Sequence, residues 1–309
     1  MKQTVIEKNI SKILSNDYVL EVQSGTSALI ISLLLQKNKS KKNEVLLPSI
    51  CCPAVLTAIN FCNLKPVFVD MEKKFFNMDL NSIEKLLNKD TLAIIGVHSY
   101  GIAFDTKKIR SLCNENEIFF IEDCCLSIGG KDADTIIGTS GDISIFSFGS
   151  GKIISLKGGA MAFKDRSDFM NASKLISSNN ILKCPSYDDV EMNQKFKSLE
   201  ENIENRRIVA KYYYEQINNP KFLKPVYRHT DVYWRYPLLI NGNREKFISI
   251  AKENNLIITH HYPSLANFQY DNKLNVADEF NESIINLFVN ININDPYADK
   301  VCNFISEYE

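Results

Sequence analysis

The chain has 309 residues, of which 45% are hydrophobic and 24% charged, and its 36 basic and 37 acidic residues give a formal net charge of -1. This length and composition predict a globular protein with one large and one smaller domain, and they exclude a mainly disordered chain. Because the charges are interspersed, the sequence argues against nucleic acid as a partner. No apolar run is long enough to cross a bilayer, and the polar opening segment is unlike a signal peptide, so no membrane partner is expected.

Eight cysteines include adjacent pairs at 51–52 and 124–125, both inside apolar stretches. Neither pair has the two-residue spacing of a zinc or redox motif. We therefore expect small, reduced, core-filling thiols in a cytoplasmic protein, and no metal site.

Short apolar strands alternate with helical patterns from residue 18 to about residue 164. Apolar strands separated by helices indicate a mostly parallel sheet that is buried on both faces. The fold class is therefore α/β, with a large domain over residues 1–188. Helices are expected at 26–36, 53–62, 81–88 and 106–115, and strands at 44–48, 65–70, 91–98, 117–123, 142–148 and 158–163.

Residues 189–309 differ in character and predict a smaller C-terminal α+β domain, which a long connecting helix joins to the first. The expected elements are a charged helix at 189–217, a strand at 231–240, a helix near 243–254, a short strand near 256–259 and a last helix near 296–307.

Residues at the carboxyl ends of strands are informative, because ligands of open α/β sheets gather there. Ser24, Gly25 and Thr26 directly precede an apolar helix, and a turn of this kind can bind an anion through free backbone N–H groups. Simple N-capping by Ser24 or Thr26 is the alternative. His98 and Tyr100 follow another strand, where either could be a buried polar residue with a structural partner.

Two ionisable residues follow later strands. Asp123 ends the apolar run EIFFIED, where a carboxylate needs a partner because an unpaired buried charge is costly, although it could instead cap the next turn. Lys152 stands on the Gly-rich turn after ISIFSF, where loss of hydration would make its amine a nucleophile toward carbonyls. Lys157 is its near rival, and an exposed, inert loop lysine is the alternative.

The order and spacing of these segments resemble the DegT-type sugar aminotransferase family, which belongs to the fold-type I pyridoxal 5'-phosphate (PLP) enzymes. The resemblance implies that Lys152 forms the internal aldimine with PLP and moves the substrate proton, and that Asp123 pairs with the pyridinium nitrogen. Gly25, Thr26 and Ser147, with Ser24 beside them, would hold the phosphate. The matching segments span nearly the whole chain: SGTSAL, KPVFVD, VHSYG, IEDCCLSIGG, GDISIFSFGSGK, GGA, RRIVAKYY, VYWRYPLLI and HHYPSL.

This sequence departs from the family pattern close to the expected site. Cys52 stands where an aromatic residue usually stacks on the cofactor ring, and Leu126 stands where a polar residue usually lies near the ring oxygen. We expect both positions to contact the cofactor. Ile153 replaces a frequent asparagine, and the segments before SGTSAL and after GGA are shorter than in the family.

Residues expected near the substrate are His98, Tyr100, His261 and Tyr262, the last two because they match the family segment beside the substrate opening. Arg228 and Arg235 are further candidates, because a guanidinium can bind a carboxylate or phosphate with two hydrogen bonds. A structural ion pair is the alternative for Arg235.

The expected function is transamination of a nucleotide-linked keto sugar, with an amino acid such as glutamate as donor and PLP as cofactor, in a homodimer. One alternative is a PLP enzyme of another reaction, such as a lyase, or with a smaller substrate, because the shortened segments would reshape the site. The other is a non-catalytic binding or partner subunit, which Cys52 and Leu126 favour and the retention of Lys152 and Asp123 opposes.

Overall fold

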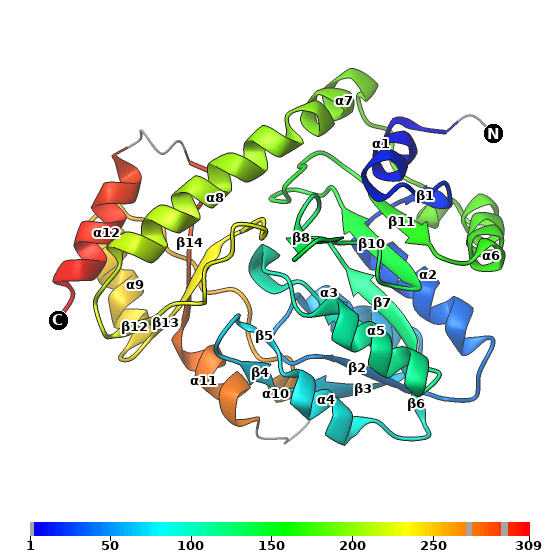
Figure 1. The fold of residues 1–309 in the computed structure, drawn as a ribbon, viewed down its shortest axis with the longest axis horizontal. Coiled ribbons are helices and arrows are strands. Elements are labelled where there is room, and N and C mark those ends of the chain that lie inside the picture. Colours follow the sequence, from blue (N-terminus) through cyan, green and yellow to red (C-terminus); the bar gives the residue numbers. More distant parts are fainter. Residues whose placement is uncertain (1–2, 270–273, 292–295) are drawn as a thin grey trace.

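A computed structural model describes residues 3–269, 274–291 and 296–309. Its central feature is a seven-stranded sheet with the order β1-β11-β10-β7-β6-β2-β3 (Figure 1). Every neighbouring pair is parallel except the two that β11 forms, so the prediction of a mostly parallel sheet is confirmed. The strands are β1 Val19–Val22, β2 Glu44–Pro48, β3 Lys65–Val69, β6 Thr91–Val97, β7 Phe119–Asp123, β10 Ile143–Ser147 and β11 Gly159–Phe163.

Helices cover both faces of this sheet, which explains why its strands are apolar throughout. Successive side chains of a strand point to opposite faces. In β2, Val45 and Leu47 accordingly pack in one core cluster with α2 and α3, while Leu46 packs in another with α4 and α5. The helices of this part are α1 Val5–Leu14, α2 Gly25–Lys37, α3 Pro53–Phe61, α4 Leu80–Leu86, α5 Thr106–Glu115 and α6 Arg166–Ser178.

A smaller antiparallel sheet, β12-β13-β14, forms the core of the C-terminal part. The long helix α8 runs from beside α7 to α12 and spans the two sheets (Figure 1). The predicted boundary between residues 188 and 189 stays a prediction. The elements are α7 Asp189–Lys197, α8 Leu199–Gln216, β12 Phe222–Leu223, β13 Tyr236–Ile240, α9 Arg244–Glu253, α10 Ala266–Gln269, α11 Asn275–Ser283, β14 Ile284–Leu287 and α12 Tyr297–Glu307.

Short elements complete the described chain. They are the strand pairs β4 Met71–Glu72 with β5 Asn77–Met78 and β8 Lys131–Asp132 with β9 Thr135–Ile136, and the 3-10 turns Ser99–Gly101 and Asn180–Leu182.

Three expected elements of the C-terminal part differ from the structure. The helix expected at 189–217 is broken at Ser198, whose hydroxyl donates to two carbonyls of the preceding turn. The strand expected at 231–240 begins only at Tyr236, because Tyr233 has a left-handed φ of 55°. The strand expected near 256–259 is a single bridge between Thr259 and Asn286. In the described residues, no helix is both long and apolar enough to cross a membrane.

Candidate active site

The predicted site residues from two strands and one helix start meet at one edge of the large sheet. Asp123 ends β7, Ser147 ends β10, and Gly25 begins α2. A Cβ placed on Gly25 would lie 2.9 Å from Cys125 Sγ and 3.1 Å from Ser147 Cβ. The helix start therefore packs directly against the ends of these strands, and only glycine fits there.

The N-terminus of α2 is capped by a side chain, and it also has the geometry that the predicted anion site requires. Ser24 is its N-cap, and the Ser24 Oγ accepts a hydrogen bond from the Ser27 N–H at 3.2 Å. The first N–H groups of a helix lack intrahelical acceptors and carry the positive end of its dipole. Gly25 and Thr26 are the first two residues of this 13-residue helix, so the turn is capped and also suited to a phosphate.

Asp123 is a buried carboxylate with a side-chain exposure of 6%. One of its oxygens accepts a hydrogen bond from the Cys125 N–H at 3.0 Å. Among the described residues, no lysine, arginine or histidine forms an ion pair with it. Because an unpaired buried charge is costly, this environment suits a cationic N–H group brought by a ligand.

Lys152 lies on a tight turn that follows β10. The Lys152 N–H donates to the Gly149 carbonyl at 3.2 Å, and Gly151 takes a φ of +77° that favours glycine. The Lys152 side chain is half-buried, whereas Lys157 is exposed. This difference favours Lys152 over Lys157 as the nucleophile, although its role stays a prediction.

Cys125 connects these groups, and the sequence analysis did not single it out as a site residue. Burial raises the pKa of its thiol well above the ordinary value, the nearby Asp123 carboxylate raises it further, and the Lys152 amine lowers it. The thiol is therefore within electrostatic range of both the carboxylate and the amine. In its neutral form it is a small, polarisable group beside them.

Glu122, the neighbour of Asp123, points away from this site. Its carboxylate accepts hydrogen bonds from the backbone N–H groups of Gly138, Ser140 and Gly141 at 2.8–2.9 Å. Burial raises the pKa of Glu122, but hydrogen bonds from His98 and from these amides outweigh burial and hold the pKa below its ordinary value. Glu122 thus fastens the 138–141 loop beneath the sheet.

His98 was expected near the substrate, but the structure places it in the interior. Its side chain is fully buried, its Nε2 lies 3.2 Å from a Glu122 oxygen, and its ring stacks on Phe104. This position supports the structural alternative for His98. Cys124 Sγ lies within 4.8 Å of the side-chain atoms of His98 and Glu122 that could bind a metal ion. Both Glu122 oxygens, however, already accept backbone hydrogen bonds.

Aromatic side chains lie beside the turn that carries Lys152. Trp234 stacks on Tyr262 with ring centroids 6.1 Å apart, and the Trp234 Nε1–H donates to the Gly151 carbonyl at 2.6 Å. Tyr100 is 1% exposed, and its buried hydroxyl lies near the backbone N–H of Tyr262. Burial raises the pKa values of Tyr100 and Tyr262, so both hydroxyls stay protonated and can donate to a ligand.

The remaining predicted positions differ in exposure. Cys52 is half-buried and immediately precedes α3. Leu126 is 5% exposed and packs in a hydrophobic cluster that also contains Trp234. His261 is exposed, and its ring lies 5.9 Å from that of Trp234. Contacts of these residues with cofactor or substrate stay predictions.

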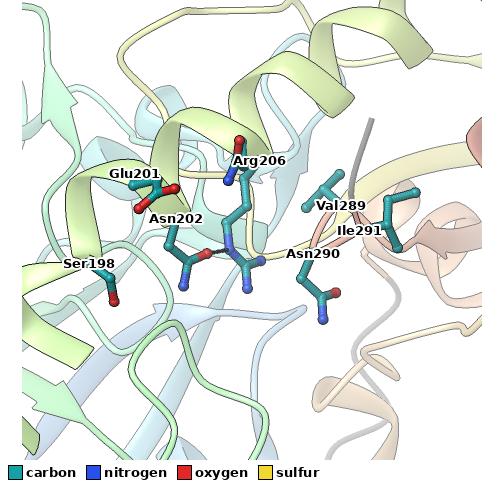
Figure 2. A pocket seen from close by; sticks show the side chains of 8 residues that line it. Ser198, Glu201, Asn202, Arg206, Val289, Asn290 and Ile291 are labelled. Carbon is teal, nitrogen blue, oxygen red and sulfur yellow. Dashed lines mark hydrogen bonds between the residues drawn. The ribbon is translucent and has the colours of Figure 1, made fainter. Parts of the chain in front are cut away.

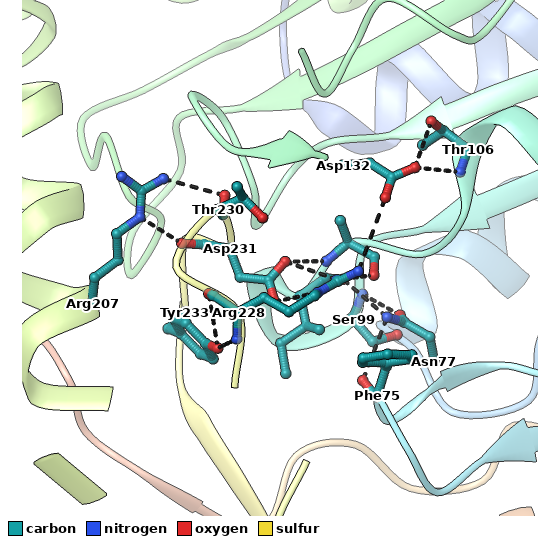
Figure 3. Close-up of polar contacts among 12 residues, drawn as sticks. Phe75, Asn77, Ser99, Thr106, Asp132, Arg207, Arg228, Thr230, Asp231 and Tyr233 are labelled. Atoms are coloured by element: carbon teal, nitrogen blue, oxygen red, sulfur yellow. Dashed lines mark hydrogen bonds and ion pairs between the residues drawn. The ribbon is translucent and has the colours of Figure 1, made fainter. Parts of the chain in front are cut away.

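Arg228 has a structural role (Figure 3). Its Nε and Nη2 donate to the two Asp231 oxygens at 3.0 and 2.9 Å, and Asp132 lies 3.9 Å from its Nη1. The guanidinium also lies 4.7 Å from the centroid of the Phe75 ring. Two carboxylates therefore neutralise Arg228, which leaves Arg235 as the candidate for a substrate anion.

Trp234 is a further site residue that the sequence analysis missed. It is the only tryptophan of the chain and stands beside Arg235 in an otherwise apolar segment, which was the available signal. The segment looked like a continuous strand. Only the turn at Tyr233 shows that the indole leaves the sheet and reaches the Lys152 turn.

Comparisons with known proteins identify the family of the chain. The model of the DegT/DnrJ/EryC1/StrS aminotransferase family matches residues 2–180. A GDP-perosamine synthase of Escherichia coli O157:H7 is 36% identical over 144 residues, which cover 47% of this chain and 39% of that protein. In this match, therefore, the chain spans well under two thirds of its relative.

Two longer matches extend beyond this region. A dTDP-4-amino-4,6-dideoxy-D-glucose transaminase of Shigella dysenteriae is 27% identical, over 85% of this chain and 77% of that protein. The PLP form of a Streptococcus pneumoniae protein has a TM-score of 0.88 at 17% identity, and the superposition covers 97% of this chain and 89% of that one. At such low identity, this likeness shows the fold alone.

Proposed function

The chain belongs to the DegT/DnrJ/EryC1/StrS aminotransferase family, and on that premise we propose that it is a PLP-dependent aminotransferase acting on a nucleotide-linked keto sugar. The observation that carries the proposal is that Asp123 and Cys125 lie against the N-terminus of α2, within electrostatic range of Lys152. A buried carboxylate, a half-buried amine and an anion-binding helix start at one sheet edge are the groups that PLP requires.

The described residues fit this cofactor. The phosphate would lie at the start of α2, where Gly25 leaves the space that a side chain would fill. Asp123 would hold the positive charge of the ring nitrogen, and the buried Tyr100 hydroxyl would face a polar group of cofactor or substrate. When bound, PLP serves as an electron sink for a substrate carbon that loses its proton.

Lys152 is the residue to which we assign the covalent bond with the cofactor and the transfer of the substrate proton. The turn that carries it is held by the Trp234 hydrogen bond to the Gly151 carbonyl. Cys52 would contact the ring where the family usually has an aromatic side chain, and Leu126 would lie near the ring oxygen where the family usually has a polar one. The stacked Trp234 and Tyr262 rings would exclude water from one side of the site.

The substrate class comes from the relatives, several of which are named as enzymes of nucleotide-linked sugars. We infer that the substrate is a keto sugar attached to a nucleoside diphosphate, and that glutamate or a similar amino acid donates the amino group. We further propose a cytoplasmic homodimer. Light scattering of the purified protein tests the dimer, which a mass of one chain, 35.2 kDa, would contradict.

Reductive trapping tests the cofactor and its lysine. Protein incubated with PLP should gain a visible absorbance band, and borohydride should then fix the cofactor on the peptide that contains Lys152. Lys152→Ala should lose the fixed label, while the matched control Lys157→Ala should keep it. Failure to bind PLP, or labelling at Lys157, would overturn the assignment.

Product analysis tests the reaction. Incubation with nucleotide-linked 3- or 4-keto sugars and glutamate should yield an amino sugar and one equivalent of 2-oxoglutarate. Conversion of the sugar without consumption of any amino donor would instead support the lyase alternative.

A further inference from the structure

Arg206 of α8 is a buried cation that pairs with no carboxylate among the residues that the structure describes. Its side chain is 5% exposed, and its Nε donates to the Asn202 Oδ1 at 2.8 Å. One terminal nitrogen donates to the carbonyls of Tyr233 and Trp234 at 3.4 and 3.2 Å. All of these partners are neutral, so the guanidinium keeps its full charge in the interior.

Arg235 is a second cation that pairs with no carboxylate among the described residues, and it is half-buried. It lies close to Arg206, because both guanidinium groups donate to the Trp234 carbonyl. The Arg235 guanidinium lies 3.9 Å from the ring centroid of Phe288 and 4.7 Å from that of Trp234. One nitrogen donates to the Asn290 Oδ1 at 3.3 Å, and the buried Nε has no partner among the described residues. Aromatic faces attract a cation, but they do not neutralise it.

These two arginines repel each other. Burial lowers the pKa of Arg206 to about 10, and the charge of Arg235 is the second cause. Elsewhere in the described chain, four partly buried arginines each pair with a carboxylate within 4.0 Å. They are Arg110 with Asp142, Arg207 with Glu204, Arg228 with Asp231, and Arg244 with Glu245. Arg206 and Arg235 therefore differ from these four arginines, because no carboxylate among the described residues balances their charges.

A cavity of about 630 Å³ opens beside Arg206, between α8 and the segment after β14. Figure 2 shows the Arg206 guanidinium and the Asn290 side chain on the two sides of this opening, with Asn202 hydrogen-bonded to Arg206. Glu201 also lines the cavity, but its side chain is exposed and forms no ion pair with Arg206. The cavity thus gives a ligand access to Arg206 and to Asn290, whose side-chain oxygen accepts a hydrogen bond from Arg235.

We propose that Arg206 and Arg235 form a binding site for an oxyanion group of a substrate, a carboxylate or a phosphate. An incoming anion would neutralise two buried charges that repel each other, and arginine offers paired N–H donors to both kinds of group. Arg235 stacks on Trp234, and Trp234 hydrogen-bonds to the residue before Lys152. The Trp234 side chain would therefore connect the anion site to the turn that carries the Lys152 amine.

The two sources of such an anion are the carboxylate of the amino donor and the diphosphate of the sugar nucleotide. The identity of these two sources rests on the proposed function. The binding of an anion by Arg206 and Arg235 does not. The phosphate of PLP is a third anion, but it has its own site at the start of α2. Titrations are therefore best made with PLP present throughout.

Calorimetric titration of the full chain with inorganic pyrophosphate and, separately, with glutarate tests the proposal. We expect saturable binding of at least one of them, and the preferred anion identifies the source. Arg206→Gln and Arg235→Gln should each weaken this binding about 10- to 100-fold, the usual effect of losing hydrogen bonds to a charged group. The control Arg207→Gln, which removes the same charge from the next residue of α8, should leave it unchanged.

Trp234 offers an independent signal, because it is the only tryptophan and Arg235 lies over its ring. Binding of the anion should change its fluorescence with the same dissociation constant. In turnover, Arg235→Gln should raise the KM of one substrate, donor or sugar nucleotide, more than that of the other. Arg206→Lys, which keeps the charge, should bind the anion more tightly than Arg206→Gln.

Lys152→Ala separates this proposal from the proposed function, because it should abolish turnover and leave anion binding intact. Absence of saturable binding by both anions would overturn the anion site. Equal weakening by Arg207→Gln would also overturn it, because the attraction would then depend on net charge alone. The half-buried Arg235 provides a test even if Arg206→Gln lowers the stability of the protein.

Discussion

Replacement of Gly25 by alanine tests whether the start of α2 packs as closely against β10 as the structure shows. The new Cβ would lie 2.9 Å from Cys125 Sγ and 3.1 Å from Ser147 Cβ, well inside the roughly 3.5–4.0 Å of ordinary carbon contacts. Overpacking of this kind costs about 1–3 kcal/mol, and alanine recovers about 0.4–1 kcal/mol by restricting the unfolded chain. We therefore expect a loss of about 1–2 kcal/mol, together with weaker PLP binding.

A double-mutant cycle identifies the atom responsible. Cys125→Ala removes the Sγ that the new Cβ would meet, so the two changes together should destabilise the protein by about 1 kcal/mol less than their sum. Urea unfolding of the four proteins measures this coupling. Gly149→Ala is the control, because its Cβ would meet only Ser147 Oγ at 3.9 Å. Additive effects, or a Gly25→Ala protein as stable as the control, would refute the close packing.

Three further substitutions test other contacts of the site. Because the pKa of Glu122 lies below its ordinary value of 4.5, its carboxylate stabilises the fold above that pH and loses this effect as the pH falls. Glu122→Gln should thus lower the free energy of unfolding by about 2–4 kcal/mol at pH 7. Unfolding curves should show that this difference between the wild type and the variant becomes smaller below pH 4.5. Ser24→Ala removes the N-cap of α2 and should lower the unfolding free energy by about 1 kcal/mol, whereas an unchanged urea midpoint would show that the cap contributes nothing. Trp234→Phe should speed amide exchange of the 149–152 turn, measured by mass spectrometry, and equal exchange would mean that the indole hydrogen bond does not hold the turn.

Much of the large sheet could be predicted because its signals are local. The apolar runs that became β6, β7 and β10 are continuous in the sequence, Asp123 is the last residue of β7, and Lys152 lies on the turn after β10. Their meeting at one edge follows from the rule that parallel strands end on the same side. The same logic placed Ser24 and Gly25 at a helix start.

Contacts that depend on the rest of the fold could not be predicted in this way. Nothing local distinguishes His98 from a substrate residue, because its partner Glu122 lies 24 positions away on the neighbouring strand. Arg228 and Arg235 look alike in the sequence, yet carboxylates neutralise only the first. The burial of Arg206 depends on the carbonyls of Tyr233 and Trp234, which approach α8 only because the chain turns at Tyr233.

Glu122 and Asp123 also bear on how the central strand finds its place during folding. Adjacent residues of a strand face opposite sides, so a shift of β7 by one residue would exchange the two carboxylates. Glu122 would lose its three backbone N–H partners, and Asp123 would be carried away from the Lys152 side. The shifted pairing would therefore raise the free energy of the protein through β7, the strand that carries the proposed cofactor-binding residue Asp123. The same pair of acids that prepares the site also selects the correct alignment of β7 against β6 and β10.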